Sequence, residues 1–288
     1  MSMPRLDCAY ALAALLTGSL LVACSGETHV TLLAPIVSQA GATSNGAPEG
    51  GGDGSASAGT DAAPPSSSAH LIHRYSFDGD GMRVIDSIGS AHGNLEGGAV
   101  LDGAGHATLD GVDDYVNLPN GLLSGLTDAT LVAWLAWNGG PCWQRVFDFG
   151  STDAGEDRVG NATSSLFATP LRCPGKGPAT SFETTTSLLG SVDSDTPFPV
   201  LNVSAIAVVV DTTRQELRLY AAGVPLGTGA VASLSLLSDT NDWLGRSQWV
   251  QDVHLRGTYD EFRIYDEALS DADLAALEAA GPDGPTAP

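Results

Sequence analysis

The chain has 288 residues and carries 34 acidic against 12 basic side chains, which gives a formal net charge of -22. Lys176 is its single lysine. A field of this sign repels nucleic-acid phosphates and anionic bilayer surfaces, so the composition argues against sequence-independent binding to either. The length allows one large β domain or two small ones, and the order of the segments has to decide between them.

Residues 1–23 have the pattern of an export signal, with Arg5 near the start, an apolar run, and small residues before Cys24. The run is too short to span a bilayer as a helix. The sequence Leu-Val-Ala-Cys ending at Cys24 resembles the bacterial lipoprotein signal, in which the cysteine sulfur receives a diacylglyceryl group. We therefore expect a bacterial lipoprotein that is anchored in a lipid bilayer through acylated Cys24 and lies outside the cytoplasm. An ordinary secretory signal is the alternative.

Residues 24–69 consist mainly of Gly, Ala, Ser, Thr and Pro, a composition that cannot bury a core. A flexible coil of about 45 residues has ends on the order of 40 Å apart. We expect this segment to be a disordered tether that holds the following domain away from the membrane. Ser25 stands where an aspartate can retain lipoproteins at an inner membrane, so an outer membrane or cell-surface location is expected.

Two cysteines remain after export, because Cys8 leaves with the signal and Cys24 is acylated. Export to an oxidising compartment favours a disulfide between Cys142 and Cys173. In the chain-entropy model, a closed loop of about 30 residues stabilises the fold by roughly 3 to 4 kcal/mol. Two unpaired thiols or a metal pair are the alternatives.

From residue 70 to residue 281, short apolar or alternating runs recur between glycine-rich turns, which predicts one all-β domain. The run Thr130–Trp137 shows the alternation best. Its apolar residues fall on two faces: Leu131, Ala133, Leu135 and Trp137 on one, Val132 and Trp134 on the other. Because both faces are apolar, we expect the strand to be covered on both sides and its two tryptophans to lie in the core.

The sequence predicts one short helix, at the end of the domain. Ser270 can cap its first turn with Asp273 three residues later, and two leucines then fall on its inward side. Gly281, followed by proline, ends it. Residues 282–288 are expected to form a disordered tail.

The ordered set of segments resembles the laminin-G-like, concanavalin A-like jelly-roll group that is common in bacterial exported proteins. The segments that carry the resemblance are RYSFDGDG, VIDSIGSAHGNL, LDGVDDYVNLP, TLVAWLAW, QRVFDFG, VDTTRQELRLYAAGVPLG, WLGRSQW and GTYDEFRIYDEALSDADL. The resemblance implies a two-sheet antiparallel jelly-roll sandwich with one short C-terminal helix, in which the first and last strands are neighbours. This scaffold supports lectins, carbohydrate-binding modules, adhesive repeats, glycosidases and lyases, so the fold leaves the function open.

The resemblance also implies a structural Ca²⁺ ion near the first and last strands. The matching positions are Asp86 in VIDSIG and Asp260 in TYDEF, with Asp78 a further candidate by its nearness in sequence. Carboxylates in glycine-rich turns suit calcium, which takes several oxygen ligands. The alternative is that these carboxylates cap turns or pair with Arg74 and Arg263.

Two segments have the composition of a sugar site. Carbohydrate rings present apolar C–H faces and many hydroxyls, so their sites combine aromatic rings with carboxylates, amides or guanidinium groups. The candidate ligand-binding residues are Trp143, Gln144, Arg145 and Asp148 in the first segment, and Arg246, Gln248, Trp249, Gln251 and Asp252 in the second. The alternative is that each tryptophan packs on its own loop.

No catalytic motif stands out in the sequence. The paired-carboxylate pattern E-x-D-x-x-E of related glucanases is missing, as are the motifs of related alginate lyases, and the six histidines are scattered. We therefore expect no enzyme activity, but a membrane-anchored module that binds carbohydrate through loop residues. A structural or adhesive envelope lipoprotein that binds exported proteins is the alternative, and a glycoside hydrolase or polysaccharide lyase is a third.

Overall fold

The computed structural model describes residues 70–174 and 177–284. The predicted export signal, the lipidation site Cys24, the tether and the last four residues of the predicted tail lie outside the described residues. The chain divides into two units after residue 61, and every described residue belongs to the second. Within these ranges no helix is both long and apolar enough to cross a membrane.

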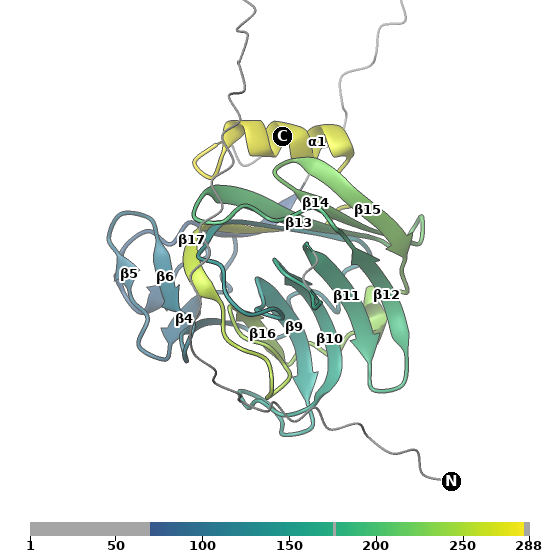
Figure 1. The fold of residues 1–288 in the computed structure, drawn as a ribbon, viewed down its shortest axis with the longest axis horizontal. Helices are drawn as coiled ribbons and strands as arrows, with labels where there is room; N and C mark the ends of the chain where they lie inside the picture. Colours follow the sequence, from purple (N-terminus) through teal and green to yellow (C-terminus); the bar gives the residue numbers. More distant parts are fainter. Residues whose placement is uncertain (1–69, 175–176, 285–288) are drawn as a thin grey trace, which may run out of the picture. The chain divides into compact units, whose positions relative to one another are not determined.

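Two antiparallel β-sheets form the layers of the described fold (Figure 1). The first sheet has nine strands in the spatial order β15-β14-β13-β8-β17-β6-β5-β2, with β1 paired to β17. Its strands are β1 Leu71–Tyr75, β2 Asp80–Gly81, β5 Leu101–Asp102, β6 Ala107–Asp110, β8 Ala129–Trp137, β13 Val203–Asp211, β14 Glu216–Ala221, β15 Val224–Ala230 and β17 Arg256–Tyr265.

The second sheet has eight strands in the order β12-β11-β10-β9-β16-β7-β4-β3. Its strands are β3 Arg83–Val84, β4 Gly93–Glu96, β7 Tyr115–Leu118, β9 Phe147–Thr152, β10 Ala162–Thr169, β11 Ala179–Thr184, β12 Leu188–Asp193 and β16 Asn241–Leu244. A short 3₁₀ helix, Leu234–Leu236, lies between β15 and β16. The predicted two-sheet antiparallel sandwich is confirmed.

The first and last strands are neighbours, as the resemblance implied. Tyr75 of β1 pairs with Phe262 of β17, and Arg74 pairs with Arg263. On its other edge β17 pairs along most of its length with β8. The last strand is therefore central in the first sheet, which explains why it carries so many apolar residues.

The main core lies between the two sheets and is built from alternate residues of each strand. Strand β8 contributes Leu131, Ala133, Leu135 and Trp137. Strands β9 and β17 add Phe147, Phe149 and Phe262, whose ring centroids lie within 6.1 Å of one another. Each such side chain contributes on the order of 1.5 to 3 kcal/mol when it is fully buried.

The helix α1, Asp271–Ala280, covers the outer face of the first sheet (Figure 1). The Ser270 hydroxyl accepts a hydrogen bond from the Asp273 amide, and the Asp273 carboxylate accepts one from the Ser270 amide, so the predicted cap is confirmed. Leu274 and Leu277 pack in a second apolar cluster with side chains of the sheet, among them Trp134. Strand β8 is thus covered on both sides, and its two tryptophans are buried, as predicted.

Candidate functional site

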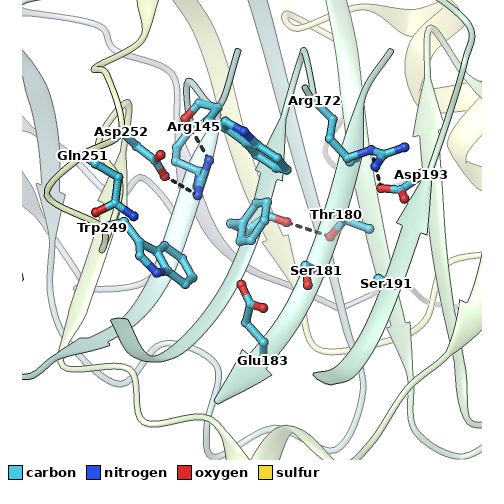
Figure 2. A pocket seen from close by; sticks show the side chains of 13 residues that line it. Arg145, Arg172, Thr180, Ser181, Glu183, Ser191, Asp193, Trp249, Gln251 and Asp252 are labelled. Carbon is cyan, nitrogen blue, oxygen red and sulfur yellow. Dashed lines mark hydrogen bonds and ion pairs between the residues drawn. The ribbon is translucent and has the colours of Figure 1, made fainter. Parts of the chain in front are cut away.

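A cavity of about 520 Å³ lies on the outer face of the second sheet (Figure 2). Side chains alternate along a strand, so residues next to core residues point outward. Leu166 of β10 and Phe182 of β11 belong to the core, and their neighbours Phe167, Ser181 and Glu183 line the cavity. Strands β10 to β12 therefore form its floor, and two loops form its wall.

Three aromatic rings surround one end of the cavity. Phe167 lies on the floor, and the rings of Trp143 and Trp249 stand nearly perpendicular to it, at interplanar angles of 79° and 82°. Their centroids lie 6.4 and 6.1 Å from that of Phe167. Both tryptophans are half-buried, so each leaves part of its ring open to a ligand.

Arg145 holds these rings and the two loops together. Its guanidinium carbon lies 4.0 Å from the ring centroid of Phe167, a cation–π distance. Its Nε donates to Asp148 Oδ2 at 3.2 Å, one terminal nitrogen donates to the Trp143 carbonyl at 2.8 Å, and the other donates to Asp252 Oδ2 at 2.6 Å. Arg145 is 2% exposed, so it organises the site more than it faces a ligand.

Asp148 lies beneath Arg145 and is fully buried. Its carboxylate accepts hydrogen bonds from the Ser165 hydroxyl at 2.5 Å and from the backbone N–H of Gln248 at 3.0 Å. Burial raises the pKa of Asp148 to about 6, against the opposing effect of Arg145 and these hydrogen bonds. The carboxylate thus fixes Arg145 on one side and the loop of Gln248 on the other.

The loop between β16 and β17 carries Trp249 and Asp252. Its base is closed by a hydrogen bond of 2.8 Å from the Leu255 amide to the Gly245 carbonyl. Gly245 has φ +85°, and a Cβ there would collide with the Leu109 side chain, so only glycine suits this turn. A further bond from the Val250 amide to the Gly160 carbonyl ties the loop tip to the β9–β10 connection.

The loop before β9 is fixed by a disulfide between Cys142 and Cys173, whose Cα atoms are 5.5 Å apart, and the predicted bridge is confirmed. The Trp143 amide donates to the Leu171 carbonyl at 2.9 Å beside this bridge. The bridge therefore holds Trp143 at the cavity.

Across the cavity from Trp249 and Asp252, Arg172 pairs with Asp193, as Figure 2 shows, with Nε and Oδ1 2.9 Å apart. Glu183 is the remaining charged residue of the lining, and it extends from the floor between these two sides (Figure 2). Burial raises its pKa, which nearby Arg145 partly offsets. Among the described residues, the Glu183 carboxylate forms no hydrogen bond or ion pair, so it is free to accept hydrogen bonds from a ligand.

The cavity brings together five of the residues that the sequence suggested for a ligand site. These residues are Trp143, Arg145, Trp249, Gln251 and Asp252. Sequence reasoning missed the floor and the far side, including Phe167, Glu183, Arg172 and Asp193. Glu183 and Asp193 lie in short polar strands that the apolar patterns did not reveal, although the predicted disulfide pointed to the neighbourhood of Arg172.

Four of the suggested residues do not line this cavity. Asp148 lies below it, as described above, and Gln144 is buried, with its amide bound to the Trp137 indole and the Gly139 carbonyl. Gln248 is also fully buried, and its side chain bonds to Asn241.

The fourth of these residues, Arg246, stacks on other aromatic rings. Its guanidinium carbon lies 4.1 Å from the ring centroid of Trp243 and 4.4 Å from that of Tyr115. The polar groups of Asp148, Gln144 and Gln248 hold loops in place, whereas Arg246 packs on these two rings.

Asp86 does not fit a calcium ligand. Its two oxygens accept four backbone N–H groups at 2.9 to 3.1 Å, and Oδ2 also lies 2.7 Å from His73 Nδ1. Burial opposes ionisation, but the hydrogen bonds from His73 and the backbone lower the pKa of Asp86 to about 2. Its lone pairs are occupied in holding residues 87–91 against β1, which matches the alternative of a turn-capping carboxylate.

The other two suggested calcium ligands have less crowded carboxylates. Asp260 Oδ1 lies 3.3 Å from His106 Nε2, and its buried Oδ2 has no hydrogen-bond partner among the residues that the structure describes. Asp78 Oδ2 accepts a hydrogen bond from the Ser76 hydroxyl at 2.7 Å. Calcium binding by these two residues stays a prediction. The side chains of Arg74 and Arg263 both pair with Glu261.

One acidic group in the described ranges has ligand-like spacing. The carboxylates of Asp110, Asp113 and Asp114 lie within 4.8 Å of one another. This group was not suggested by the sequence, and exposed acidic groups of this kind are common without an ion.

The two sheets, the paired terminal strands and the open face with aromatic and polar side chains define a lectin-like jelly-roll domain. The chain belongs to the laminin-G family described as the concanavalin A-like lectin/glucanases superfamily, whose model matches residues 110–275. No curated protein matches the sequence.

Several solved structures share the fold. Domain 4 of AbnA, an extracellular GH43 arabinanase from Geobacillus stearothermophilus solved with arabinotriose, has a TM-score of 0.58 and 21% identity over 73% of this chain and 98% of that chain. Trypanosoma rangeli sialidase in complex with sialic acid has a TM-score of 0.53 and 14% identity over 72% of this chain and 32% of that chain. The binding domain of botulinum neurotoxin DC, solved with rat synaptotagmin II, has a TM-score of 0.53 and 12% identity, over 73% and 51% of the two chains.

Proposed function

We propose that the protein binds carbohydrate in the cavity on the outer face of the second sheet. The observation that carries this proposal is the pair of half-buried rings, Trp143 and Trp249, which flank Phe167 beside a floor of polar side chains. Sugar rings have apolar C–H faces that pack on aromatic rings and hydroxyls that need polar partners. One cavity offers both.

Polar groups on three sides of the cavity suit sugar hydroxyls. The Glu183 carboxylate, which has no partner in the described part of the chain, accepts hydroxyl donors from the floor, and Asp193 does so from the far strand. Gln251 offers both an acceptor and a donor from the loop. Family membership and the fold shared with an arabinanase domain solved with arabinotriose support the same ligand class.

The bound sugar is expected to leave unchanged. Glycoside hydrolysis requires two carboxyl groups flanking one bond, one of them available as an acid. Of the carboxylates that line the cavity, Asp193 and Asp252 are each paired with an arginine, which leaves Glu183 alone. Incubation with the tightest ligand should release no new reducing ends, and steady release of them would overturn this part of the proposal.

A glycan array followed by calorimetry tests the proposal. Trp143→Ala and Trp249→Ala should each weaken binding at least about fivefold, because each removes an aromatic surface worth about 1 kcal/mol or more. Val250→Ala is the matched control, since this neighbouring side chain is 62% exposed and lies outside the cavity lining. A blank array, with and without calcium, would contradict carbohydrate binding.

The sequence supports a surface location for this binding. We propose that Cys24 carries the lipid and that residues 25–69 separate the domain from the membrane. Two or three acyl chains hold a protein on a bilayer nearly permanently, because each buried methylene contributes about 0.8 kcal/mol. Cys24→Ser should abolish labelling by a radioactive fatty acid and release the protein from the membrane fraction. An unchanged fractionation would overturn the anchor.

A protein partner is the second candidate ligand. Three apolar side chains near the start of β13, Val200, Leu201 and Val203, are 44%, 70% and 49% exposed. Exposed apolar groups in one place favour contact with another protein. The test is the capture of a protein partner from an envelope fraction. Capture that free sugar does not inhibit, and that Leu201→Ser abolishes, would support this function over carbohydrate binding.

A further inference from the structure

The cations that line the cavity are already paired. The guanidinium of Arg145 donates hydrogen bonds to Asp148, Asp252 and the Trp143 carbonyl, and one of its faces lies on the ring of Phe167. Arg172 faces Asp193 at 2.9 Å. An acidic ligand is normally held by an arginine whose planar donors and charge are both available to it. Arg145 has donors on all three nitrogens engaged, and the charge of Arg172 is already matched by Asp193.

The anions exceed the cations in this lining. Glu183, Asp193 and Asp252 contribute three carboxylates against the two arginines, and Glu183 has no ion pair among the described residues. The full chain adds a net charge of -22. A ligand carboxylate would therefore meet an unpaired like charge at the floor, and it has no proton with which to bond to Glu183.

Neutral sugar hydroxyls are attracted to the Glu183 carboxylate instead of being repelled by it. A hydroxyl donates to a carboxylate in a charge-assisted hydrogen bond, which is stronger than a bond between neutral groups. The aromatic rings contact the C–H face of the sugar without regard to its net charge. The rings therefore contribute affinity for neutral and acidic saccharides alike. The charge of Glu183 makes the affinity for neutral saccharides higher than that for acidic ones.

We infer that this cavity selects neutral saccharides and discriminates against acidic ones, such as uronic acids and sialic acids. The inference rests on the proposed function. It names Glu183 as the residue that sets the specificity.

The test is a comparison of matched neutral and acidic probes by calorimetry on the full chain. The best matched pair is methyl-esterified with de-esterified oligogalacturonate, in which the backbone is constant and the carboxyl charge changes. Lactose with sialyllactose is a second pair, in which the acidic member also carries an added sialic acid residue. In each pair that binds, the neutral member should bind at least about tenfold tighter at low salt. Raising the salt concentration should narrow the ratio, because screening weakens the repulsion.

Glu183→Gln should narrow the neutral-to-acidic ratio at least about threefold, because the amide keeps the shape and removes the charge. Glu216→Gln, on β14 of the other sheet, is the matched control and should leave the ratio unchanged. Acidic probes that bind as tightly as their neutral partners, or a ratio that Glu183→Gln does not change, would overturn the inference and leave the proposed function standing. Failure of every saccharide to bind would overturn both.

Discussion

The outer faces of the two sheets have opposite characters. The first sheet is covered by helix α1, and its outward side chains, such as Trp134 and Tyr220, lie in an apolar cluster with Leu274 and Leu277. The second sheet has no helix over it within the described residues, and its outward side chains line an open cavity.

Residue type alone therefore does not tell whether a tryptophan packs in the core or contacts a ligand. Both faces carry a tryptophan near an arginine: Trp134 with Arg263 at 4.9 Å from its ring centroid, and Trp249 with Arg145 at 5.5 Å. Trp134 is 1% exposed, whereas Trp249 is half-buried. The helix decides the difference, because it takes the place that a ligand would occupy.

The largest effect is expected on the covered face. Trp134→Ala should lower the free energy of unfolding by about 3 to 5 kcal/mol, because it leaves a cavity between the sheet and the helix. Urea unfolding followed by circular dichroism measures this loss.

Trp249→Ala is the partner variant for that comparison. It should cost less stability than Trp134→Ala and remove more of the glycan affinity, since its ring is part of the open face. Equal losses of stability in the two variants would mean that the two faces do not differ as described.

The second prediction concerns the disulfide that holds one loop of the open face. Replacing Cys142 and Cys173 by serine should cost about 3 to 4 kcal/mol in the chain-entropy model, and it should also weaken glycan binding because Trp143 loses its support. Unfolding of oxidised and reduced protein checks the first part and calorimetry the second. Full affinity in the double-serine variant would show that the bridge does not position the site.

The third prediction follows from burial beneath the open face. The pKa of Asp148 is raised to about 6, mainly by burial. Near pH 4 the unfolded chain begins to ionise this carboxyl while the folded protein still binds the proton, so stability falls as pH rises from about 4 to about 6. Burial raises the pKa of Asp242 as well, which acts in the same direction.

Asp148→Asn should therefore flatten part of this dependence in urea unfolding between pH 4 and 7. Asp86 does not interfere in this range, because its pKa is lowered to about 2 and its contribution is lost only at lower pH. An unchanged slope in the Asn variant would contradict the raised pKa.

The smallest expected effect lies away from both faces, at the predicted calcium ligands. If Asp260 and Asp78 hold calcium, a chelator should lower the melting temperature by a few degrees, as loss of a bound ligand does, and Asp260→Asn should abolish the difference. Asp86→Asn should destabilise the protein equally with and without the chelator, because it breaks a loop cap. A melting temperature that the chelator leaves unchanged would remove calcium from the account.

Strands with strong apolar alternation could be predicted from the sequence, and those with weak alternation could not. Strand β8 and the capped helix α1 were predicted with their faces and ends. Strands β10, β11 and β12 were not among the predicted segments. Their outward residues are mostly polar, with Phe167 as the exception, and their inward residues mix Leu166 and Phe182 with small ones such as Ala168 and Gly190, so the period of two is faint.

The same limit applies to the candidate site. The sequence showed the wall, because Trp143 and Trp249 stand out among polar neighbours, but the floor lies on the strands that went unrecognised. It also counted Gln144 and Gln248 among the ligand-binding residues, which the structure places in buried hydrogen bonds. Burial of such groups depends on segments that meet across 100 residues, as Asp148 and Gln248 do, and no local pattern records that contact.

Indole N–H signals in a ¹H–¹⁵N spectrum test the central claim most directly, because the five tryptophans of the chain are divided between covered and open positions. Titration with the tightest neutral glycan should shift the signals of Trp143 and Trp249 and leave those of Trp134 and Trp137 in place. A glycan that binds while the first two signals stay fixed would contradict a binding site on the open face of the second sheet.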